Sequence, residues 1–230
     1  MTEARTNQIR VFAGVNGAGK SSVLGEAFAR AGGSFFDPDR VTRELLAANP
    51  SMSLDAANSE AWTMGRSRLE RAIAERRDFA FETTLGGTSI TALLERAAAL
   101  GQDVEMAYVG LDSVERHIAR VRARVAAGGH DIPEPRIRER YHTSRHNVVR
   151  LLPSLNRLRV WDNSAEADPK SGARPRPLLI LETARGRAPT HAPLDQVPDW
   201  AKPIVAAALR TAAATPASAP PRRRPPRAAR

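Results

Sequence analysis

The sequence of 230 residues contains no cysteine. This absence excludes disulfide bridges, thiolate nucleophiles and any zinc or iron–sulfur site built on cysteine. No apolar run approaches the roughly 18 residues that a membrane-spanning helix needs. The first residues, MTEARTNQIR, also lack the apolar core of a signal peptide. We therefore expect a cytoplasmic protein that has no membrane partner.

Aromatic residues are scarce as well, at 5% of the chain, and they are not interleaved with the basic residues. This pattern argues against a base-stacking surface and so against a nucleic-acid partner. The net charge of +10 is partly a property of the C-terminus, because residues 216–230 hold five arginines and no acid. Proline, alanine and arginine alternate there with nothing to bury, which predicts a disordered basic tail over 215–230. Contact of this tail with nucleic acid or an anionic membrane is the alternative to a plain solvated extension.

Short apolar runs alternate with helical patterns along the rest of the chain. Strands are expected at 8–13, 34–36, 78–83, 104–109, 159–161 and 178–181. Helices are expected at 20–30, 38–49, 54–77 and 89–100, after Asp112, up to about residue 152, and once after residue 197. This alternation predicts an α/β fold, with a mostly parallel sheet covered on both faces in three layers. The length suits one main domain over 1–196, followed by a helical extension over 197–214 and the tail.

A phosphate-binding loop follows the first expected strand. Residues 14–21 read GVNGAGKS and match the pattern G-x-x-x-x-G-K-[ST]. Glycines let successive backbone N–H groups turn toward an anion, and the following helix points its positive end at the same anion. In this pattern the lysine reaches the β and γ phosphates and the serine holds Mg²⁺. We predict that ATP or GTP is bound with Mg²⁺ by Gly14, Asn16, Gly17, Ala18, Gly19, Lys20, Ser21 and Ser22, with Ser21 as the metal ligand.

Three carboxylates are expected near the same edge of the sheet, because ligands bind beyond the carboxyl ends of parallel strands. Asp37 precedes Pro38, so we interpret it as the N-cap of a helix. Asp39, inside the first turn, is either a helix-dipole acid or the base that accepts the proton of a substrate hydroxyl. Glu82 ends a buried strand, where a charge is costly without a partner. It could orient the water shell of Mg²⁺, bind substrate or cap the next turn.

An arginine-rich segment over about 112–142 has the features of a mobile lid. Arginines repeat at i, i+4 and i+8 beside an apolar stripe, at Arg116, Arg120 and Arg124. After the break at 128–129 come His130, Arg136, Arg138 and Arg140. Arginines on a lid can neutralise the charge that develops on a transferred phosphoryl group. A solvated helix face is the alternative for each of them, and Arg116 points most directly away from the core. His130 is a titrating contact or an ordinary loop residue.

Five segments, taken in order, resemble the zeta-toxin-like kinases. They are AGVNGAGKSS, DPDRVTREL, FAFETTLGG, RVRARVAAGGHDIPEPRIRERY and VWDNS, and the likeness runs from about residue 9 to residue 182. The resemblance implies a P-loop kinase fold with a helical lid. It also implies ATP-dependent, sometimes GTP-dependent, phosphorylation of a nucleotide sugar, best known for the 3′-hydroxyl of UDP-N-acetylglucosamine. An antitoxin that occludes the nucleotide site would then be a partner.

The resemblance also implies roles for individual residues. Lys20 and Ser21 match the phosphate and Mg²⁺ contacts, and Asp39 matches the catalytic base. Glu82 matches the substrate-binding acid at the end of its strand, and we add Thr83 and His130 to the substrate-binding set. Arg120 and Arg124 match the catalytic arginines of the lid.

Two other functions remain open from the sequence. The first is a P-loop kinase whose acceptor is a nucleoside, a sugar or an antibiotic. The second is a nucleic-acid-associated ATPase in which the basic tail binds the nucleic acid.

Overall fold

A six-stranded sheet organises residues 7–165 and 176–214, the part of the chain that the computed structural model describes. The strand order is β2-β1-β3-β4-β5-β6. Four strands run parallel: β1 (Gln8–Ala13), β2 (Phe79–Thr83), β3 (Asp103–Gly110) and β4 (Arg157–Asp162). β5 (Leu178–Ala184) and β6 (Thr190–His191) join antiparallel. The prediction of a mostly parallel α/β sheet is confirmed.

The helices follow the strands in the expected alternation. They are η1 (Ser21–Gly25), α1 (Glu26–Arg30), α2 (Pro38–Ala48), α3 (Leu54–Ala74), α4 (Thr88–Ala99), α5 (Val114–Ala126), α6 (Glu134–Leu151), η2 (Leu152–Ser154), η3 (Leu194–Gln196) and α7 (Lys202–Ala214). None of these helices is both long and apolar enough to cross a bilayer, within the residues described.

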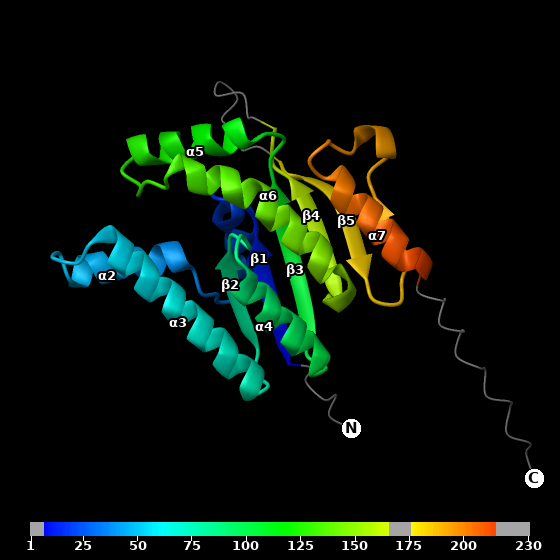
Figure 1. Cartoon of the computed structure of the whole chain (residues 1–230), viewed down its shortest axis with the longest axis horizontal. Helices are drawn as coiled ribbons and strands as arrows, with labels where there is room; N and C mark the ends of the chain where they lie inside the picture. The colour runs from blue at the N-terminus through cyan, green and yellow to red at the C-terminus, as the bar shows by residue number, and fades with distance from the viewer. Residues whose placement is uncertain (1–6, 166–175, 215–230) are drawn as a thin grey trace, which may run out of the picture.

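The two faces of the sheet are covered unequally. In Figure 1, α4, α6 and α7 lie over one face, with α2 and α3 beyond the β2 edge. Alternate residues of β1, such as Ile9 and Val11, are buried in the main core on this side. Phe12 points to the other face, where its ring meets Phe28 of α1 and Phe35 edge-on. The sheet is therefore the middle of three layers, and the short η1–α1 segment belongs to the thinner outer layer, on the face to which Phe12 points.

Helix boundaries follow their capping residues. Asp37 caps α2, because its Oδ1 accepts the N–H of Asp39 at 2.9 Å, as predicted. Ser113 caps α5 by accepting the N–H of Arg116 at 3.3 Å. Gly101, with φ of 75°, ends α4 in the left-handed conformation that glycine adopts readily.

Two expected elements differ in the structure. The strand at 34–36 is wrong: only Phe36 pairs, in a single parallel bridge with Phe81, because Asp37 and Pro38 already begin α2. The helix expected over 20–30 is divided into the π turn η1 and the α-helical turn α1. Gly25 lies at the junction, where an added Cβ would come within 2.6 Å of the Phe35 ring.

The segment predicted as a lid is a helical hairpin, formed by α5 and α6, and it has a hydrophobic cluster of its own. Val15 of the phosphate loop packs there with Ile118, Val121 and Ile137. In Figure 1, α5 and the first turns of α6 project beyond the upper end of the sheet, and the rest of α6 lies over its face. The lid is thus packed directly on the loop that precedes η1.

The C-terminal segment is continuous with the main core. Trp200 and Ile204 are buried there, together with residues from β3, β4 and α6. The predicted domain boundary between residues 196 and 197 therefore falls inside one hydrophobic core. The basic tail predicted over 215–230 lies outside the described residues.

Candidate active site

The carboxyl ends of β1 to β4 lie side by side at one end of the sheet, and each strand leads into a segment with polar groups. β1 leads into the phosphate loop, β2 ends in Glu82 and Thr83, β3 leads to α5, and β4 leads to Asn163. This convergence is a property of parallel strands. It brings together side chains that are far apart in the sequence.

The phosphate loop is closely surrounded by backbone from other elements. Gly17 and Gly19 have φ of 81° and 88°, a region that disfavours residues with a side chain. An added Cβ would lie 2.6 Å from the His117 carbonyl oxygen at Gly17 and 2.6 Å from Asn163 Nδ2 at Gly19. Asn163 Nδ2 also donates to the Ala18 carbonyl at 2.9 Å. The shape of the loop is therefore fixed by its neighbours as well as by its own glycines.

His117 supports the same loop from α5. Its Nδ1 lies 2.9 Å from the Asn16 carbonyl oxygen, which can only accept, so the Nδ1 carries the proton. Burial lowers the pKa of His117 to about 4, with the nearby charge of Lys20 acting in the same direction. The imidazole is therefore neutral at physiological pH and serves to position the loop.

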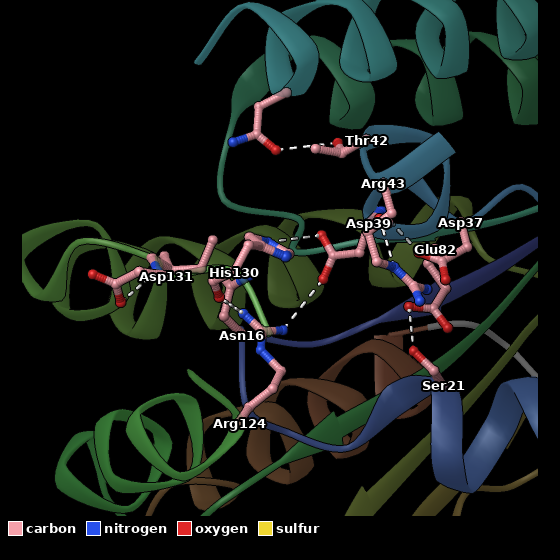
Figure 2. Close-up of polar contacts among 12 residues, drawn as sticks. Asn16, Ser21, Asp37, Asp39, Thr42, Arg43, Glu82, Arg124, His130 and Asp131 are labelled. Atoms are coloured by element: carbon pink, nitrogen blue, oxygen red, sulfur yellow. Dashed lines mark hydrogen bonds and ion pairs between the residues drawn. The ribbon is translucent and has the colours of Figure 1, made fainter. Parts of the chain in front are cut away.

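Ser21 and Glu82 form a pair at the start of η1. Ser21 Oγ donates to Glu82 Oε2 at 3.1 Å, while Glu82 Oε1 is buried without a hydrogen-bond partner among the described residues (Figure 2). Burial raises the pKa of Glu82 to about 6, and the opposing effect of Lys20 is smaller. Asp37 and Asp39 also raise this pKa, which places all three carboxylates within electrostatic reach of one another.

The Ser21–Glu82 pair fits a magnesium ion. Hydroxyl and carboxylate oxygens are the ligands that Mg²⁺ prefers, usually one or two from the protein with phosphate oxygens and water completing the shell. The orphaned Glu82 Oε1 supplies such an oxygen beside the predicted metal ligand. Across residues 7–165 and 176–214, no group of three or more His, Asp or Glu side chains could hold a metal by itself. An ion here would therefore depend on the nucleotide phosphates.

We expect Glu82→Gln to stabilise the metal- and nucleotide-free protein by about 2 kcal/mol above pH 7. The folded-state pKa of about 6 exceeds the ordinary value of 4.5, so the folded state prefers the protonated carboxyl. The protonated Glu82 carboxyl therefore contributes its full stability below pH 4.5, and this contribution is lost as the pH rises through 6. The gain from glutamine should therefore shrink toward zero between pH 8 and pH 4.5 in urea unfolding. A gain independent of pH would contradict an ionisation effect.

Asp39 stands within a small polar cluster between α2 and the lid. Arg124 Nη1 lies 3.3 Å from Asp39 Oδ2, and His130 Nε2 lies 3.6 Å from Asp39 Oδ1 (Figure 2). Arg124 Nη2 donates to the His130 carbonyl at 3.0 Å. Two residues predicted as catalytic and one predicted to bind substrate thus meet at one point. The Asp39 side chain is still 45% exposed, so a substrate hydroxyl can reach it.

The lid arginines divide into those that face the site and those that do not. Arg120 Nη2 donates to the Asn163 carbonyl at 2.8 Å, on the side of the phosphate loop. Arg140 Nη1 donates to Asn16 Oδ1 at 2.8 Å. Burial lowers the pKa of Arg140, and the charge of Asp39 opposes this shift. Arg116 instead pairs with Asp112, and Arg138 pairs on the outer surface with Glu134 and Glu115.

Thr83, predicted to bind substrate, forms hydrogen bonds with backbone groups of the neighbouring loops. Its hydroxyl accepts the Leu85 N–H at 3.0 Å, and its carbonyl accepts the Gly14 N–H at 3.2 Å. These bonds shape the loop after β2 and join it to the phosphate loop. A substrate contact for Thr83 stays a prediction.

Sequence reasoning missed three residues of this site. In the sequence, Arg140 is one of several arginines that follow the break at 128–129. His117 lies among the apolar positions of the helix after Asp112, and Asn163 appears only within the motif VWDNS. Asn163 could have been found from its place directly after a parallel strand. The other two are brought in by the crossing of α5 and α6 over the loop, which no local pattern reveals.

The sequence matches a known family and a relative from another organism. The family model described as zeta toxin matches residues 1–168. An uncharacterized protein of Haemophilus influenzae (strain Rd) is 32% identical over 136 residues, which cover 59% of this chain and 93% of that protein.

Two solved structures resemble the fold. The crystal structure of AvrRxo1-ORF1:AvrRxo1-ORF2 with sulphate ions has a TM-score of 0.62 at 15% identity, covering 84% of this chain and 62% of that chain. The crystal structure of AvrRxo1-ORF1:-ORF2 with ATP has a TM-score of 0.58 at 16% identity, covering 79% and 59%. The chain thus spans about three fifths of the length of these solved chains. At this level of identity the similarity establishes the fold.

Proposed function

The chain belongs to the zeta toxin family, and from this premise we propose that it is a nucleotide-dependent kinase that phosphorylates a hydroxyl of UDP-N-acetylglucosamine or a related UDP-sugar. The observation that carries the proposal is the position of Asp39. Its carboxylate stands beside Arg124 and His130 and acts electrostatically on Glu82, next to the phosphate loop. A base, a phosphate cradle and lid arginines are the parts that phosphoryl transfer requires.

Donor binding is assigned to the phosphate loop. Its N–H groups and the start of η1 would hold the phosphates of ATP or GTP, with Lys20 neutralising the β and γ oxygens. Asn163 and His117 keep the loop in this shape through the Ala18 and Asn16 carbonyls. Ser21 and Glu82 would hold Mg²⁺, which when bound neutralises charge on the phosphate oxygens.

Transfer would proceed by in-line displacement at the γ phosphorus. The acceptor oxygen forms a bond to phosphorus, the bond to the β–γ bridging oxygen breaks, and the nucleoside diphosphate leaves with that electron pair. Asp39 takes the proton of the acceptor hydroxyl. Arg120 and Arg124 are the catalytic arginines of the proposal, and their charge would stabilise the transferred group. Arg140, which is bonded to Asn16 of the phosphate loop, would add to this effect.

A protein partner is part of the proposal. The family resemblance implies an antitoxin, which would cover the nucleotide site. A UDP-sugar acceptor would place the activity in the cytoplasm.

The proposal is tested by incubating the full chain with Mg²⁺ and ATP or GTP and a panel of acceptors. UDP-N-acetylglucosamine, other UDP-sugars, nucleosides, simple sugars and aminoglycoside antibiotics form the panel, with products identified by mass spectrometry. We expect the mass of a UDP-sugar to increase by about 80 Da, which corresponds to one added phosphoryl group. Phosphorylation of a nucleoside, sugar or antibiotic alone would overturn the acceptor class while leaving the kinase intact. Absence of any phosphorylated product would overturn the proposal.

A further inference from the structure

The C-terminal segment is joined to the donor end of the sheet by one indole ring. Trp200 lies just before α7 and is only 3% exposed. Its Nε1 donates to Asp162 Oδ1, at the end of β4, at 3.1 Å. Because the parallel strands share their carboxyl end, this contact lies at the same end of the sheet as the phosphate loop. The family model matches residues 1–168, so Trp200 lies outside the matched region.

The indole ring is packed closely against β3 as well. An added Cβ on Gly110 would lie 2.4 Å from Trp200 Cη2, so a side chain at that position would displace the ring. The rings of Tyr108 and Trp200 have their centroids 6.1 Å apart, within the range of a favourable aromatic pair. The ring therefore touches the ends of two neighbouring strands. This packing holds its N–H donor in the direction of Asp162.

Asp162 extends the connection to the start of the lid. Its Oδ1 also accepts the Ser164 hydroxyl at 2.6 Å, and Ser164 Oγ in turn accepts the Asp112 N–H at 2.8 Å. A hydroxyl that donates to a carboxylate presents its lone pairs to a second donor, so the two bonds support each other. Asp112 directly precedes Ser113, the N-cap of α5. The residues after β4 are thereby tied to the first turn of the lid.

Asn163 lies between these two anchored residues and contacts the donor site directly. Its side chain donates to the Ala18 carbonyl at 2.9 Å, and its carbonyl accepts from Arg120 at 2.8 Å. Its N–H donates to the Gly110 carbonyl at 3.0 Å. Asn163 is buried, so these bonds are made away from bulk water. A rotation of the backbone at this point would break all three bonds together.

We propose that Trp200 is a positioning residue of the donor site, which acts through Asp162 on Asn163 and so on the phosphate loop. The inference rests on the proposed kinase function and deepens it, because it gives the C-terminal segment a part in nucleotide binding. Loss of the indole N–H frees Asp162, and the bond from Asn163 to the phosphate loop weakens with it. The loop N–H groups that hold the phosphates are then less well preorganised, which lowers the affinity for the nucleotide.

The first test uses Trp200→Phe, which keeps an apolar ring and removes the N–H donor. We expect the dissociation constant of Mg²⁺–ATP, measured by calorimetry on the full chain, to rise about fivefold, a usual effect of one lost hydrogen bond. Asp162→Ala removes the acceptor and should raise it at least as much, because the bond from Ser164 is lost as well. This variant carries the test if Trp200→Phe does not fold. An affinity equal to wild type in Asp162→Ala, or in a folded Trp200→Phe, would overturn the proposal.

The matched control is Ile204→Val, which loosens the same C-terminal core without removing a polar group. It should lower the midpoint of urea unfolding and leave the affinity for Mg²⁺–ATP unchanged. An equal loss of affinity in Trp200→Phe and in this control would show that any loosening of the core has the same effect. That result would overturn the positioning role of Trp200.

A double-variant cycle tests whether Trp200 acts through Asn163. Asn163→Ala alone should weaken Mg²⁺–ATP binding, because the Ala18 carbonyl loses its donor. Adding Trp200→Phe to Asn163→Ala should change the affinity by less than about twofold, because the connection is already broken. Fully additive losses would overturn the path through Asn163. If this pattern is found but no acceptor is phosphorylated, the kinase proposal fails and the positioning role stands.

Discussion

Lys20→Ala is expected to reduce phosphoryl transfer at least about a thousandfold, because a cation placed where charge develops is among the largest contributions to catalysis. The structure places Lys20 at the start of η1, where its charge acts on both Glu82 and His117. Its removal would leave the donor phosphates with the loop N–H groups, the lid arginines and any bound metal. The measurement is kcat from nucleoside diphosphate release, with phosphorylated product quantified in parallel.

Two comparisons make the Lys20 result specific. Lys202→Ala, on the exposed surface of α7, should leave activity unchanged. Lys20→Ala should also weaken nucleotide binding in calorimetry. A rate within tenfold of wild type, or unchanged affinity for Mg²⁺–ATP, would contradict the assignment of residues 14–21 as the phosphate cradle.

Asp39→Asn is expected to lower kcat by about 10²- to 10⁴-fold, the usual effect of losing a positioned general base. Asparagine keeps the size of the side chain and an oxygen that can accept from Arg124, so the cluster with His130 should persist. It cannot take the acceptor proton. The affinity for Mg²⁺–ATP should therefore stay within about twofold, in contrast to Lys20→Ala, because the donor site is untouched.

Asp37→Asn is the matched control for this prediction. Asp37 lies two residues away and caps α2 by accepting the Asp39 N–H, and asparagine caps helices about as well as aspartate. Its kcat should stay near wild type. Equal losses in the two variants would point to disruption of α2, and an unaffected Asp39→Asn variant would remove Asp39 as the base.

Several parts of the site could be predicted from local sequence because they depend on short-range geometry. A glycine loop followed by lysine and serine is shaped by the conformations its own residues allow, and Gly17 and Gly19 have the positive φ angles expected of them. The Asp37 cap involves atoms two residues apart. Glu82, near the end of one parallel strand, and Asn163, directly after another, could also be expected to lie near each other, because the carboxyl ends of parallel strands lie together.

The lid shows where local reasoning stops. Helical spacing placed Arg116, Arg120 and Arg124 on neighbouring positions of one helix, yet each has a different partner in the structure: Asp112, Asn163 and Asp39. Arg140 looked no different from Arg138 in the sequence, but it reaches Asn16 while Arg138 pairs on the outer surface. The spacing of apolar residues shows which side of a helix faces the core. It does not show which residues of other elements lie opposite that side.

The sequence by itself determined the phosphate loop, the alternation of strands and helices and the order of the motifs, because each depends on the backbone preferences of neighbouring residues. Only the tertiary structure decided that Arg124 and His130 meet Asp39 and that Glu82 pairs with Ser21. The contacts of the site join residues as many as 145 positions apart, as between Asn163 and Ala18. They arise from how α5 and α6 pack over the sheet edge, which depends on the whole core rather than on any one segment.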